Sequence, residues 1–64
     1  MNDPKSIISR AIKFNSLEAA IRFVEGCNVP SKFKVVLGDS GQYWVVTNRE
    51  ASILISSGYE LAEQ

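Results

Sequence analysis

The chain contains no histidine and only one cysteine, Cys27. A single cysteine cannot form an intrachain disulfide, and without imidazole or a second thiol the chain lacks the ligands of structural zinc sites. A serine-histidine-aspartate hydrolytic site is excluded too, because no histidine can accept the serine proton. The carboxylates are spread so that no close pair is forced by their spacing. We therefore predict no metal, no cofactor and no catalytic centre, and do not expect an enzyme.

Long apolar runs are also lacking. No segment approaches the roughly 20 apolar residues that cross a bilayer, and the N-terminus does not have the layout of an export signal. The composition, 45% hydrophobic and 22% charged, is typical of a globular chain. We expect one small soluble domain over residues 1–64, located in the cytoplasm without membrane contact, with 1–3 and 62–64 frayed.

The chain has no net charge, since seven basic residues balance seven acidic ones. The charges are unevenly distributed: residues 1–34 hold six basic and three acidic residues, and 35–64 hold one basic and four acidic. A possible basic face consists of Arg10, Lys13, Lys32 and Lys34. Nucleic-acid binding usually needs several phosphate contacts on a clearly basic surface, so a solvated face is favoured. A small nucleic-acid-associated regulator using this face is kept as the alternative function.

Apolar residues in the first 26 positions recur at helical spacing. They predict a helix over 4–14, capped by Asn2 or Asp3, and a second helix over 17–26, capped by Ser16. Whether this stretch forms two helices or one bent helix is left open by the pattern.

The pattern then changes to segments rich in β-branched and aromatic residues, which predict a β-hairpin over 32–47. Its turn is Gly38-Asp39-Ser40-Gly41. We expect Asp39 and Ser40 at the centre of a type I turn and Gly41 with a positive φ, which makes a three-residue loop.

Thr47 and Glu50 are spaced as a reciprocal capping box, so a third helix is predicted over 48–57. Gly58 can end that helix, and residues 59–61 alternate like a short returning strand. The predicted fold is therefore α+β, in the order α-α-β-β-α-(β), with an antiparallel hairpin packed against short helices.

Both faces of the predicted hairpin are apolar, although a sheet covered on one side should alternate apolar and polar residues. One face carries Phe33, Val35, Leu37, Tyr43 and Val45, and the other carries Val36, Trp44 and Val46. Two interpretations follow. Either the first helices cover one face and the third helix covers the other, or the Trp44 face or the free hairpin edge binds a partner.

The second interpretation leads to our functional prediction. Tryptophan and tyrosine dominate interface energetics, so we predict a partner interface at Val36, Tyr43, Trp44 and Val46. The expected function is a non-enzymatic protein-protein interaction module. It would act as a homodimer, or as an adaptor or inhibitor that binds a larger complex, and self-association is the favoured form of partner binding.

Overall fold

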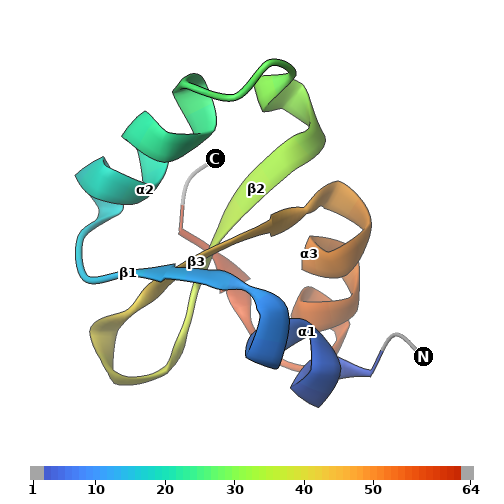
Figure 1. Cartoon of the computed structure of the whole chain (residues 1–64). Helices are drawn as coiled ribbons and strands as arrows, with labels where there is room; N and C mark the ends of the chain where they lie inside the picture. Colours follow the sequence, from blue (N-terminus) through green and yellow to red (C-terminus); the bar gives the residue numbers. More distant parts are fainter. Residues whose placement is uncertain (1–2, 63–64) are drawn as a thin grey trace.

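The structure, a computed structural model, describes residues 3–62 and confirms a small compact α+β domain (Figure 1). The helices and strands in chain order are α1 (Pro4–Arg10), β1 (Ile12–Phe14), α2 (Leu17–Glu25), β2 (Phe33–Leu37), β3 (Tyr43–Thr47), α3 (Asn48–Ser56) and β4 (Glu60–Leu61). Two short 3-10 turns, η1 (Pro30–Lys32) and η2 (Asp39–Gly41), precede β2 and connect β2 to β3. Within the described residues, no helix has the length and apolar character needed to traverse a bilayer.

The predicted helix starts are confirmed by side-chain caps. The carboxylate of Asp3 and the hydroxyl of Ser16 each accept a hydrogen bond from the backbone amide three residues on. Thr47 and Glu50 form the full capping box, with both reciprocal bonds present. Asn2, the other predicted cap of α1, lies outside the described residues.

The predicted helix over 4–14 is wrong in its second half. The helix ends at Arg10, and Ile12–Phe14 forms β1 against β3. Lys13 stabilises this ending because its ammonium donates to the backbone carbonyl oxygen of Ile8 at 2.6 Å. Three residues alternating apolar, basic and apolar fit a strand as well as a helix, so pairing with β3 decides between them.

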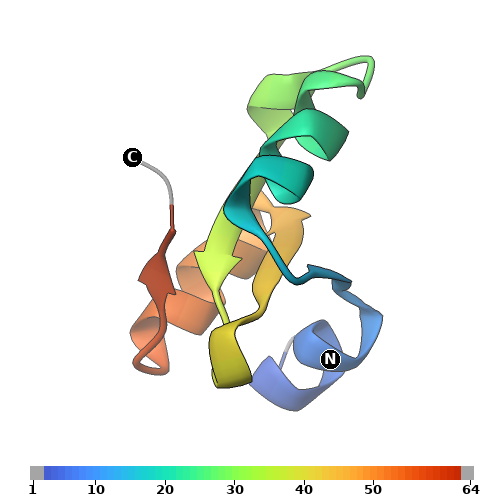
Figure 2. The ribbon, with the colours of Figure 1, turned by 90° about the vertical axis from the view of Figure 1, so that its left-hand side faces the viewer.

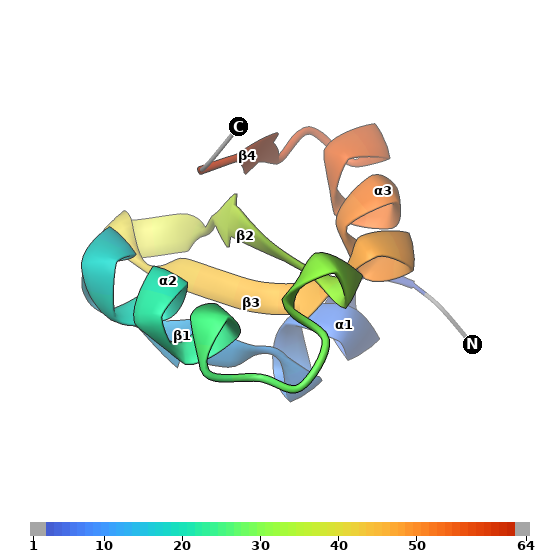
Figure 3. The same ribbon diagram turned by 90° about the horizontal axis from the view of Figure 1, so that it is seen from above.

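The sheet has four strands in the order β1-β3-β2-β4, and every neighbouring pair is antiparallel. Figure 3 shows this order from β4 at the top to β1 at the bottom. β1 pairs with the outer side of β3 and β4 with the end of β2, so among the described residues the predicted free hairpin edge is present only at the start of β2. The short strand after Gly58 is confirmed, and it pairs with the end of β2.

The hairpin register confirms the predicted division of its two faces: Val36 pairs with Trp44 and Val35 with Val45. The turn is partly as predicted, because Gly41 has a φ of 75°. The predicted type I turn is wrong, because Ser40 is also left-handed, with a φ of 57°. Consecutive left-handed residues follow the right-handed twist of the strands, which an ordinary type I turn would splay apart.

The strand order explains why the helices lie on both sides of the sheet. β1-α2-β2 and β3-α3-β4 are two interleaved units in which a helix joins parallel strands separated by one other strand. In both units the second strand lies nearer the β4 edge of the sheet than the first strand does. The strands of one unit run antiparallel to the strands of the other. Two connections of the same hand must then place α2 and α3 on opposite faces, and right-handed crossovers are strongly preferred.

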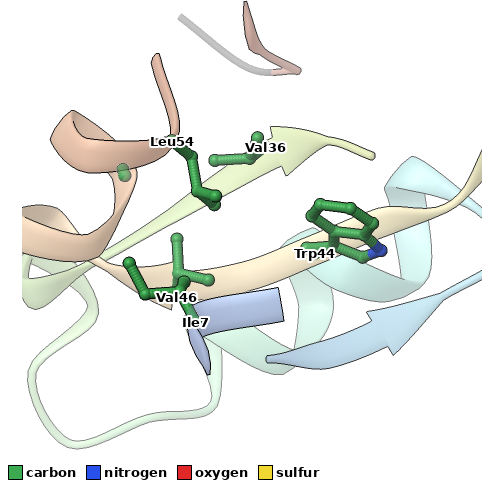
Figure 4. Packing of buried hydrophobic residues seen from close by; sticks show 6 residues of the cluster. Ile7, Val36, Trp44, Val46 and Leu54 are labelled. Atoms are coloured by element: carbon green, nitrogen blue, oxygen red, sulfur yellow. The ribbon is translucent and has the colours of Figure 1, made fainter. Parts of the chain in front are cut away.

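Two hydrophobic clusters result, one on each face. On the Trp44 face, α1 and α3 pack over the strands, and the labelled side chains in Figure 4 converge there: Ile7, Val36, Trp44, Val46 and Leu54. On the other face, α2 packs Ala20 against Val35 and Val45. The interpretation in which helices cover both faces of the hairpin is therefore the correct one. Its assignment of both early helices to one face is wrong, because α1 joins α3.

Candidate binding surfaces

The predicted partner interface does not form an accessible surface. Val36, Trp44 and Val46 are buried beneath α1 and α3, with at most 2% of each side chain exposed. Tyr43 is half-buried on the opposite face, beside the α2 cluster. We correct the prediction accordingly: three of the four residues belong to the core of the folded chain, and the fourth does not share their face.

Trp44 is enclosed by neighbouring residues of the same chain. Its indole nitrogen donates to the Gln42 side-chain oxygen at 3.2 Å, and its ring lies 5.3 Å from the ring of Tyr59. A Cβ atom added to Gly38 would lie 2.2 Å from the indole, so only glycine leaves room for the ring there. Since its polar atom is satisfied and its ring is enclosed, Trp44 stabilises the fold and is not an interface anchor.

The four residues of the predicted basic face lie on four elements of the chain. Arg10, at the end of α1, pairs with Glu50 at 3.6 Å, and Lys13 in β1 is occupied by carbonyl oxygens at the end of α1. Lys32 ends η1 and Lys34 lies in β2, which is separated from β1 by β3. The four cations therefore do not act as one patch, and the charge of Arg10 is compensated.

A groove of about 340 Å³ with both polar and apolar lining opens between α2, η1 and β2. We call it the α2–β2 groove, and its lining residues are Ile21, Val24, Glu25, Pro30, Ser31, Phe33 and Lys34. Its apolar part comes from half-buried side chains at the free side of α2 and the start of β2. Glu25 and Lys34, both exposed, add one charge of each sign.

Within residues 3–62, β4 covers only the end of β2. β4 pairs with Val36 and Leu37, and the amide of Ala62 donates to the carbonyl of Val35. Among the described residues, no strand lies beside the start of β2. Figure 2 shows this start and η1 at the top of the molecule, far from the hairpin loop at the bottom. The apolar residues there are consequently covered by α2 from one side only.

A second depression, of about 460 Å³, lies at the opposite end of the hairpin. We call it the α3–β4 hollow, and its lining residues are Leu37, Gly38, Asp39, Ser57, Gly58, Tyr59 and Glu60. The Tyr59 hydroxyl donates to the Asp39 carboxylate at 3.2 Å. Partial burial and the neighbouring Asp39 charge raise the pKa of Tyr59 above its ordinary value of 10.0. This tyrosine is therefore a neutral hydrogen-bond donor at physiological pH.

Groups that might support chemistry are scattered in this fold. Across residues 3–62, no three of the cysteine and carboxylate side chains lie close enough together to hold a metal ion. Cys27 is half-buried at the end of α2, and its thiol donates to the carbonyl of Phe23 at 3.4 Å. Glu18 pairs with Arg22 on the exposed side of α2, as expected for a solvated helix face.

Comparisons with protein-family models, with curated proteins and with solved structures found no match to this chain. The functional interpretation therefore depends on the surfaces alone. Sequence reasoning missed the α2–β2 groove, because its residues come together only when η1 and the start of β2 fold beside α2.

Proposed function

We propose that this protein is a protein-binding module without a reaction of its own, and that the α2–β2 groove is its binding site. The single observation that supports this is the groove itself, which presents apolar side chains beside one acidic and one basic residue. A surface with both apolar and polar side chains suits a protein partner. A nucleic-acid partner would instead require several clustered cations, and Arg10 is already paired with Glu50.

The exposed apolar residue Val29 strengthens the proposal. It directly precedes η1 and has 43% of its side chain exposed. Because it is joined to the groove residue Pro30, an apolar side chain is exposed next to the groove in the sequence.

Site-specific photo-crosslinking in the cells that naturally produce the protein tests the proposal. A photoreactive amino acid at Ser31, an exposed groove residue, should give a discrete protein adduct. The matched control places the same group at Ser52, which is exposed on α3 at the opposite face. Equal labelling from both positions, no adduct, or an adduct removed by nuclease would each contradict the proposal.

A further inference from the structure

We draw no further inference here: the strongest candidate, the outer edge of β1, where Ile12 is exposed and Phe14 lies against the exposed Phe23 of α2, carries none because nothing in the structure shows what covers it.

Discussion

The Trp44 face of the sheet is covered by two helices, whereas the opposite face is covered by α2 alone. The first face contains Ile7, Trp44 and Leu54 at no more than 1% exposure. The second face also has a buried centre, but Phe33 and Val24 remain half-buried at the α2–β2 groove. The two faces of the hairpin are both apolar in the sequence, but they differ in how much of them is exposed, because a different number of helices covers each face. Three predictions test that difference.

The largest effect is expected from removing the tryptophan. Trp44→Ala should destabilise the fold by about 3–5 kcal/mol, since it leaves a large cavity on the enclosed face. A chain of this length has roughly 3 to 10 kcal/mol in total, so the variant should lose a large part of its stability. Circular dichroism during thermal and urea denaturation measures this. The comparison variant Phe23→Ala, at a residue of α2 that is 39% exposed, should cost about 1 kcal/mol. Similar losses for both variants would refute the contrast between the faces.

A smaller effect is expected at Gly38. Gly38→Ala brings a methyl group into the indole ring of Trp44, and the resulting displacement should cost about 1–3 kcal/mol. Gly26→Ala is the matched control, because its added carbon lies 3.5 Å from the nearest backbone oxygen and its φ is −82°. That substitution should change the free energy of unfolding by no more than about 0.5 kcal/mol. If both variants have the same melting temperature as the wild type, the indole ring of Trp44 does not lie against Gly38 as described.

The smallest effect concerns Tyr59, whose ring packs on Trp44 at the margin of the enclosed face. Its pKa is raised in the folded chain, so the native state favours the neutral phenol. This contribution is complete below pH 10, the ordinary value, and is lost as the pH rises through the folded-state pKa. Asp39→Asn removes the carboxylate and should lower the pKa of Tyr59. Ultraviolet titration in a Tyr43→Phe background isolates the signal of Tyr59. Identical titration curves with and without the Asp39 carboxylate would show that its charge does not raise the pKa of Tyr59.

Much of the fold was predictable because its signals are local. The caps at Asp3, Ser16 and Thr47 depend on contacts within a few residues, and the hairpin register follows from the length of its turn. β1 was not predictable in the same way. Three residues carry too little periodicity to distinguish a strand from a helix end, and only β3, thirty positions further on, supplies their hydrogen-bond partners.

The candidate site was less predictable than the fold. An apolar side chain at a given position looks the same in a sequence whether a helix covers it or not. The prediction of Trp44 as an interface residue failed for this reason, because α1 and α3 enclose it and their positions depend on how the chain crosses the sheet. The groove likewise depends on how α2 packs against the start of β2.

The sequence by itself determined the helical and extended segments other than β1, the alternation of side chains along the hairpin, and the lack of residues for zinc ligation or triad chemistry. These properties follow from backbone preferences, capping and side-chain chemistry, all of which act over short distances. Only the tertiary structure decided which apolar face is enclosed, which cations are paired and where a groove remains. Those outcomes depend on strand order and connection handedness, which bring together residues that are far apart in the chain.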